Sequence, residues 1–449
     1  MSGRISYCAF LLIFLVGCQK FLDKKADKSR FILSKVSELQ GLFDNANTYA
    51  QNPVSDLLAS DDLYFTTENY NSIFSQLAKE IYSWNPNANL SQEWAFCYQR
   101  IFRMNVILEE TEKLSSEGND RALSEIKGSA LFVRALAHFM VAQLFAPYSS
   151  FDGPDNEFGI PLKLTADIES VTTRATLKQS YKTIIDELKI SAGLLPDTGL
   201  FKTRPGKAAA YGLLAKIYLS QGDYQSAEKY SDSSLQIYKA LMDYNDQTQV
   251  NINAESPFKI MNNEVTYHST SDYGLHMENC YVDSTLVSLY DSNDLRKSTF
   301  FAKQGSAYRF KGSYAGTSVT ISFTGLSTNE TFLIRSESRA RNGNIVGAME
   351  DLNSLLVKRW KSARFVPRIA TTQSEVIKTI LTERRKELCF RPGVRWTDLR
   401  RFNVDGQYAI SLTRVINGNR TDLPPGDPRY TFLIPTAVVL QNQISQNPR

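Results

Sequence analysis

The segment LAKIYLSQGDYQSAE, residues 214–228, is the part of the sequence that most clearly indicates a fold. It predicts two helices, residues 208–220 and 224–241, joined by a turn at Gly222-Asp223, because glycine readily takes the left-handed backbone that ends many helices. A weaker copy of this pattern, again helix, glycine turn and helix, covers residues 331–360. We therefore expect a mostly α-helical protein that uses helical hairpins as its scaffold.

The first hairpin is similar to a tetratricopeptide unit, in which small residues let two helices approach closely. More than the usual repeat period separates the two hairpins, so the sequence does not predict a continuous array. Between them, short runs typical of strands, at 264–267, 308–310 and 318–321, alternate with Gly, Ser and Asn. We expect one domain over residues 31–449 with a loop-rich insertion at 257–327, and loops on a rigid scaffold commonly carry binding residues.

The composition is that of an ordinary globular protein, since 42% of the 449 residues are hydrophobic and 22% are charged. The net charge of +4 on so long a chain indicates no nucleic-acid partner. The histidines and scattered cysteines fit no zinc pattern, and no nucleophile motif is present, so we expect no metal, no cofactor and no catalytic residues. A carboxylate pair for glycoside hydrolysis stays an open alternative, because that mechanism sets a distance in space and not in sequence.

The first thirty residues resemble a targeting segment. An apolar run at residues 7–16 is long enough for the core of a signal peptide but too short for a mature membrane-spanning helix. It leads into Leu15-Val16-Gly17-Cys18, which resembles the bacterial lipobox, after which the cysteine is acylated. We predict a signal peptide at residues 1–17 and a polar tether at 18–30, with a lipid on Cys18 that anchors the protein to a membrane.

Two motifs near the C-terminus are the strongest pattern in the chain: TERRKEL at residues 382–388 and GVRWTDLRR at residues 393–401. They resemble the signature of the SusD/RagB family, outer-membrane nutrient-binding lipoproteins of the Bacteroidetes. Other segments follow the family in the same order, so the resemblance covers almost the whole chain. The first motif predicts a charged helix whose arginines meet carboxylates such as Glu387 or Asp398. We expect the charged residues of both motifs to brace the scaffold rather than contact ligand: Glu383, Arg384, Arg385, Glu387, Arg395, Asp398 and Arg400.

The resemblance implies a SusD-like fold, mostly helical with tetratricopeptide units, in a lipid-anchored protein at the outer surface of the outer membrane. It also implies a SusC-like TonB-dependent transporter as partner. The implied ligand is an oligosaccharide or another nutrient, bound without catalysis by aromatic and polar side chains. One alternative is a tetratricopeptide-type assembly factor of the outer membrane that binds protein segments. A peptide cargo for the transporter is a third reading.

The best candidate for a ligand site is the run from Tyr82 to Asn89, where two aromatic residues lead into an Asn-rich turn. Trp84 can stack on a sugar while Asn85 or Asn87 bonds its hydroxyl groups, and the alternative is that Trp84 packs on the next helix. Further candidates are an acid beside an aromatic residue, and three tyrosines of the inserted loops: Asp62, Tyr64, Tyr273, Tyr308 and Tyr314.

Overall fold

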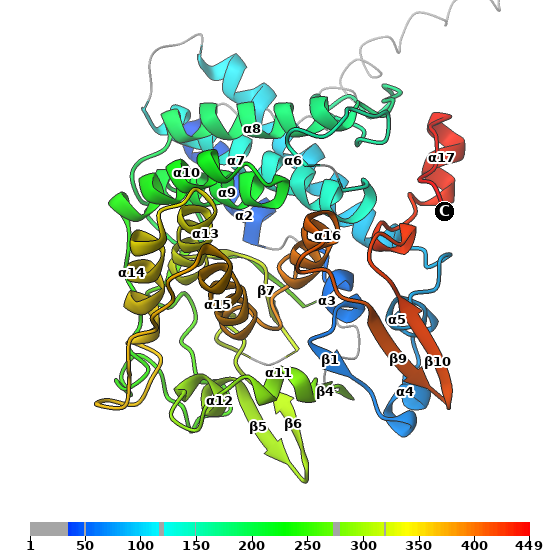
Figure 1. The fold of residues 1–449 in the computed structure, drawn as a ribbon. Helices are drawn as coiled ribbons and strands as arrows, with labels where there is room; N and C mark the ends of the chain where they lie inside the picture. Colours follow the sequence, from blue (N-terminus) through cyan, green and yellow to red (C-terminus); the bar gives the residue numbers. More distant parts are fainter. Residues whose placement is uncertain (1–34, 49–50, 116–120, 149, 273–278, 318–319) are drawn as a thin grey trace, which may run out of the picture.

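The structure is a computed structural model, and it describes residues 35–48, 51–115, 121–148, 150–272, 279–317 and 320–449. Cys18, the predicted tether and Tyr273 lie outside the described residues, so the statements made about them above stay predictions. Figure 1 shows the long helices gathered at the top and left of the molecule, with short strands at its lower end.

Helices form most of the regular structure, which confirms the predicted mostly α-helical fold. The helices before the insertion are α2 (Val36–Thr48), α3 (Ser55–Ala59), α4 (Thr67–Ser72), α5 (Gln76–Tyr82), α6 (Ser91–Ser115), α7 (Arg121–Phe145), α8 (Leu177–Leu194), α9 (Lys207–Gln221) and α10 (Tyr224–Ile237). Those within and after it are α11 (Ser284–Ser288), α12 (Leu295–Phe300), α13 (Thr328–Arg341), α14 (Ile345–Leu356), α15 (Gln373–Glu387), α16 (Arg395–Asp405), the short 3-10 helix η2 (Pro428–Tyr430) and α17 (Thr436–Asn442).

Helices α9 and α10 form the predicted hairpin and pack along each other. Gly222 ends α9 with a φ of 78°, a left-handed conformation that residues with a Cβ atom avoid. Asp223 caps α10, because its side chain accepts a hydrogen bond from the Ser226 N–H at 3.0 Å. Helix α10 ends at Ile237 and not at the predicted Leu241, since Tyr238 takes extended backbone and donates its hydroxyl to the Asn263 carbonyl at 2.6 Å.

The second hairpin, α13 and α14, has the same turn, a glycine with positive φ followed by a residue that caps the next helix. Gly343 has a φ of 90°, and Asn344 caps α14 by accepting a hydrogen bond from the Gly347 N–H at 3.0 Å. Helix α10 packs on α13, so the two hairpins are neighbours in space although the insertion separates them in sequence. The scaffold is therefore built from tetratricopeptide-like hairpins, as predicted.

Helix α7 lies in the larger of two hydrophobic cores and packs against α6 and α8. Among the described residues it is the one helix that is long and apolar enough to cross a membrane, yet 94% of its apolar window is buried inside the protein. That burial is typical of a core helix. The smaller core lies between α13, α14 and α15, around Leu333, Leu352 and Ile380.

The described part of residues 257–327 contains short strands, two short helices and loops. Strands β2 (Val265–Tyr267) and β6 (Ala307–Phe310) lie where strands were predicted, whereas β7 (Ser322–Phe323) follows the third predicted segment. All strand pairs in the described residues are antiparallel. They are β1 (Leu63–Tyr64) with β4 (Tyr281–Val282), β2 with β8 (Leu326–Ser327), β3 (Thr270–Ser271) with β7, β5 (Phe301–Gln304) with β6, and β9 (Leu412–Ile416) with β10 (Asn419–Leu423).

Candidate functional site

A cleft of about 470 Å³ lies where three segments that are distant in sequence meet. In Figure 1 these segments are found around β1, α11 and β9. The volume is within the usual range for small-molecule sites and far exceeds the room that one water needs. The lining residues are Asp61, Leu63, Tyr64, Phe65, Tyr82, Trp84, Asp283, Thr285, Arg385, Ile410, Ser411, Leu412, Thr413, Arg414 and Val415.

Strand β9 carries Arg414 on its buried face, where strand alternation favours an apolar residue. Arg414 is only 6% exposed, and its guanidinium donates to the main-chain carbonyls of Tyr82, Leu58 and Ser60. The same group lies 3.7 Å from the ring centre of Tyr82 and 4.3 Å from that of Trp84. Burial lowers the pKa of Arg414 to about 10, so the group stays charged at neutral pH. Arg414 therefore joins β9 to the N-terminal residues that form the floor of the cleft.

The hairpin that presents Arg414 is a cleft-lining element that the sequence predictions missed. Its signal was present, because Asn417-Gly418 is a dipeptide typical of a two-residue hairpin turn. Both residues have positive φ, 51° for Asn417 and 81° for Gly418, as that turn requires. The cleft residues Asp283 and Thr285 were also missed, and no local pattern distinguishes them from ordinary loop residues.

The predicted aromatic pair, Tyr82 and Trp84, lies in the floor of the cleft and is buried. Trp84 has a φ of 53°, and its Nε1 donates to the Ala59 carbonyl at 2.9 Å. The guanidinium of Arg414 lies over both rings, so these rings support the floor more than they offer a free stacking surface. Their contact with a ligand stays a prediction.

Among the aromatic residues that line the cleft, Tyr64 is the most accessible to solvent. It lies on β1 opposite Tyr281 of β4, with ring centres 5.7 Å apart and planes at 31°. Its hydroxyl makes no hydrogen bond within the described part of the chain. Partial burial raises the pKa of Tyr64, with a further contribution from Tyr281, so the hydroxyl stays protonated. Tyr64 can therefore offer a ligand both a ring and a free hydroxyl.

Three other predicted ligand residues lie outside the lining of the cleft. Asn85 uses its side-chain oxygen to accept a hydrogen bond from the Asn87 N–H at 2.9 Å, and the Asn87 side chain is exposed. Tyr308 is half-buried on β6, with the Lys297 ammonium 5.9 Å from its ring centre. Their roles as ligand contacts stay predictions.

Two further predicted ligand residues, Asp62 and Tyr314, are buried and lie outside the cleft lining, and their contact with a ligand stays a prediction. Asp62 accepts a hydrogen bond from the Phe390 N–H at 3.0 Å, and burial raises its pKa to about 6. Tyr314 donates its hydroxyl to Glu264 at 2.6 Å, and the Arg391 guanidinium lies 4.0 Å from its ring centre. Loop composition in the sequence does not reveal which side chains point inward, and these two do.

The charged residues of helix α16 and the adjoining end of α15 make buried or half-buried contacts within the protein. Arg384 pairs with Asp398 at 2.9 Å, one of the partners expected from the sequence. Arg395 forms a bidentate pair with Asp61, at 2.6 and 2.8 Å. Arg385 contacts Asp61 at 3.0 Å and not Glu387 or Asp398. The C-terminal motifs are thus joined to the N-terminal segment that forms one wall of the cleft. Arg400, further along α16, donates to the main-chain carbonyls of Gln143 and Ala146.

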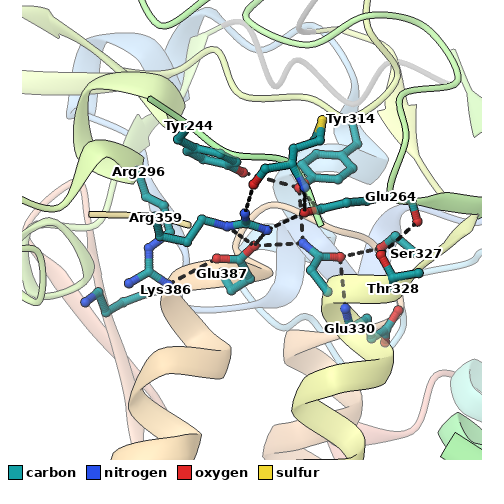
Figure 2. A network of polar contacts seen from close by, with 12 residues as sticks. Tyr244, Glu264, Arg296, Tyr314, Ser327, Thr328, Glu330, Arg359, Lys386 and Glu387 are labelled. Carbon is teal, nitrogen blue, oxygen red and sulfur yellow. Dashed lines mark hydrogen bonds and ion pairs between the residues drawn. The ribbon is translucent and has the colours of Figure 1, made fainter. Parts of the chain in front are cut away.

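Glu387 belongs to a buried polar network, which Figure 2 shows from close by. It accepts hydrogen bonds from Arg359 Nε at 2.9 Å and from Arg296 Nη1 at 3.1 Å. Arg359 also pairs with Glu264 at 2.7 Å, and Arg296 with Glu383 at 2.5 Å. Burial alone would raise the pKa of Glu387, but the two arginines outweigh it and hold that pKa below its ordinary value. These charges neutralise one another away from the cleft, so the network braces the fold.

Comparison with protein families accounts for this architecture. The family model described as "Starch-binding associating with outer membrane" matches residues 20–219, and the model of the "SusD family" matches residues 328–431. The chain belongs to the SusD/RagB family. The first match includes the cleft residues from Asp61 to Trp84, and the second includes the C-terminal motifs, so the resemblance seen in the sequence is confirmed.

The individual relatives and solved structures that resemble this chain do so at low sequence identity. The SusD-like protein P2 of Formosa agariphila is 27% identical over 143 residues, which are 31% of this chain and 26% of that protein. A SusD superfamily protein from Bacteroides thetaiotaomicron superposes with a TM-score of 0.72 at 18% identity, over 92% of this chain and 100% of that one. A laminarin-binding SusD-like protein has a TM-score of 0.63 at 18% identity, over 92% and 98% of the two chains.

Proposed function

We propose that this SusD-family protein is a glycan-binding lipoprotein of the outer membrane that delivers an oligosaccharide to a SusC-like TonB-dependent transporter. The observation that carries the proposal is the meeting of an accessible tyrosine, Tyr64, with the polar side chains Asp283, Thr285 and Thr413 in one cleft. A sugar has apolar faces and a rim of hydroxyl groups, which such a combination matches. The starch named for the family and the laminarin named for a structural neighbour are both glycans, which supports this cargo.

The lipid anchor and the outer membrane rest on the N-terminal sequence and on the family. The apolar run at residues 7–16 and the lipobox-like segment that ends at Cys18 support acylation of that cysteine. The protein would accordingly lie at the outer surface of the outer membrane, where it could pass its ligand to the transporter.

Binding without catalysis is the third part of the proposal. Two carboxylates line the cleft, Asp61 and Asp283, and a glycosidase would need one of them protonated as a general acid. Burial would raise the pKa of Asp61, but Arg395 and Arg385 outweigh it and hold that pKa well below its usual range. An acid held ionised by two arginines is suited to structure and not to proton donation.

The ligand is tested by isothermal titration calorimetry with a panel of neutral oligosaccharides that includes starch and laminarin fragments. For a glycan that binds, Tyr64→Ala should weaken binding about tenfold or more, because an aromatic contact contributes about 1 kcal/mol beyond its buried area. Tyr64→Phe keeps the ring and should lose less. Tyr308→Ala, outside the cleft lining, should bind as the unaltered protein does. Loss of binding in Tyr308→Ala with full binding in Tyr64→Ala would place the ligand elsewhere.

The transporter is tested separately by isolating the tagged, lipidated protein from detergent-solubilised outer membranes. Recovery of a large TonB-dependent barrel supports the uptake role. Reproducible recovery of other proteins without such a barrel would favour the assembly-factor alternative. Cys18→Ser should leave the protein out of the membrane fraction, and its unchanged presence there would contradict the lipid anchor.

A further inference from the structure

The connection between α14 and α15 exposes both apolar and basic side chains. It covers residues 361–371 (the α14–α15 loop), and Figure 1 shows it protruding at the lower left, below α14. Val366 is 73% exposed and Ile369 is 87% exposed, whereas Phe365 between them and the core packs on the smaller hydrophobic core. The loop therefore turns one aromatic side chain inward and two aliphatic side chains outward.

The loop lies in a segment without acidic residues. Between Asp351 and Glu375 the chain has no Asp or Glu and five basic residues: Lys358, Arg359, Lys361, Arg364 and Arg368. The first two are engaged, because Lys358 pairs with Asp243 at 3.1 Å and Arg359 belongs to the buried network. The side chains of the other three have no carboxylate within ion-pair distance in the described part of the chain. Three uncompensated cations thus accompany the two exposed aliphatic residues.

Hydrogen bonds fix the shape of the loop. Asn353 of α14 donates to the Arg368 carbonyl at 3.0 Å and accepts from the Arg368 N–H at 2.8 Å. The Lys361 N–H donates to the Asn293 carbonyl at 3.0 Å, and the Arg368 guanidinium lies 5.0 Å from a ring centre of buried Trp360. The loop is therefore held in one arrangement, and little ordering entropy would be lost when it contacts a partner.

We propose that the α14–α15 loop is a membrane-contact site that rests on the phosphate groups of an anionic lipid surface. Lys361, Arg364 and Arg368 would lie among the phosphates, and Val366 and Ile369 would enter the boundary between headgroups and acyl chains. This combination of basic and aliphatic side chains is typical of segments that lie in the interface of an anionic bilayer. The inference rests on the lipid anchor of the proposed function, which brings the protein to the membrane, and it adds a second contact.

Charge and shape favour a lipid surface as the partner. The net charge of the exposed side chains in the loop is positive, which complements phosphate. Residues 361–371 form no helix or strand, so they offer a protein partner neither a strand edge nor the apolar stripe of a helix. The segment between Cys18 and Lys35 can span up to about 60 Å when extended, so the anchor alone would not decide which face meets the membrane. A contact through this loop would decide it.

The test places a fluorescent label on the loop of the lipidated full-length protein, which is added to preformed vesicles. Val366→Cys provides the label site, since Cys97, Cys280 and Cys389 are buried. Acrylamide quenching should be at least about threefold weaker on equimolar phosphatidylcholine and phosphatidylglycerol than on phosphatidylcholine alone, because each cation near an anionic surface favours the contact about fivefold. Added salt should remove this difference.

Two controls separate the loop from the rest of the surface. Val346→Cys carries the label on an equally exposed valine, 71% exposed, at the other end of α14. That label should be quenched equally on both kinds of vesicle. Lys361→Gln with Arg364→Gln should remove most of the protection at position 366, whereas Lys178→Gln with Lys189→Gln, which remove the same charge from the exposed face of α8, should not.

Equal quenching of the position 366 label on the two kinds of vesicle would overturn the inference, and so would protection that Lys361→Gln with Arg364→Gln leaves unchanged. Protection that appears only when a transporter is present would show that the loop binds protein and not lipid. Failure of the protein to stay with vesicles of either kind would contradict the lipid anchor as well. Glycan titration reports on the cleft independently of all these outcomes.

Discussion

Two regions of this SusD-family protein are built from arginine and carboxylate side chains and differ in what they leave free. In the network of Figure 2, Glu387 contacts Arg359, Arg296 and Asn329, and no charge faces solvent. In the cleft, Asp61, Arg385 and Arg395 are paired in the same way, but Asp283 and the Tyr64 hydroxyl beside them are not.

The difference shows how a bracing site and a binding site can share one chemistry. Pairing on every side gives rigidity and leaves nothing for a ligand to contact. A paired cluster with one free carboxylate and one free hydroxyl at its edge keeps its shape and still offers contacts. Variants that separate these two roles should affect stability in one region and affinity in the other.

The largest effect on stability is expected for Glu387→Gln in the network. The amide NH₂ would face donors of Arg359, Arg296 or Asn329, so at least one buried contact is lost. Breaking a buried charged pair costs about 3 to 5 kcal/mol of unfolding free energy. Urea unfolding measures the loss. A loss under about 1 kcal/mol would show that the network does not brace the fold.

Arg414→Met should affect both stability and binding, because Arg414 joins the hairpin to the floor of the cleft. The carbonyls of Tyr82, Leu58 and Ser60 would lose their donor, which costs about 3 kcal/mol in all. We also expect glycan affinity to fall at least about tenfold. Arg414→Lys, which keeps a charged donor, should recover part of both losses. Full glycan affinity in Arg414→Met would contradict the role of Arg414 in joining the hairpin to the floor of the cleft.

A smaller effect, dependent on pH, is expected from a buried carboxylate that has no cation partner among the residues that the structure describes. Burial raises the pKa of Glu93 to about 7. The hydrogen bonds that Glu93 accepts from the N–H groups of Val54 and Ser55 lower its pKa, but burial outweighs them. Between its ordinary pKa and 7 the folded state binds more protons than the unfolded state, so stability falls as pH rises. This group alone should lower the unfolding free energy by about 2 kcal/mol from pH 5.5 to 7.5.

Glu93→Gln keeps an acceptor oxygen and removes the titration, so the variant should lose that part of the pH dependence. Urea unfolding at both pH values measures it. An unchanged difference between pH 5.5 and 7.5 in Glu93→Gln would show that Glu93 is ionised throughout this range.

The smallest effect is expected for Asp422→Asn. Asp422 pairs with Arg420 at 3.0 Å on β10, and both side chains are largely exposed. Exposed pairs contribute little, so the unfolding free energy should stay within the error of the measurement. A loss close to that of Glu387→Gln would remove the distinction between buried and exposed pairs on which the comparison depends.

The helices could be predicted because their signals are local. The glycine between two helical runs marks the turns of both hairpins, at Gly222 and Gly343. The first C-terminal motif also indicated correctly that an arginine, Arg384, meets Asp398.

The cleft could be predicted only in part, because it is made by contacts between distant segments. Tyr64, Tyr82 and Trp84 were singled out from the sequence, and all three line it. No local pattern indicates that Asp283 and Arg414 join them, or that Tyr314 points inward to Glu264. Tertiary packing decides which loop side chains stay accessible to a ligand, and no local sequence pattern indicates that packing.

Hydrogen–deuterium exchange with and without a bound neutral oligosaccharide tests the central claim most directly, namely that the cleft between the three segments is the ligand site. The account predicts slower exchange in residues 61–65, 281–285 and 410–415 together, and unchanged exchange in the hairpin at 301–310. Protection confined to that hairpin, or to the surface of α9 and α10, would contradict it.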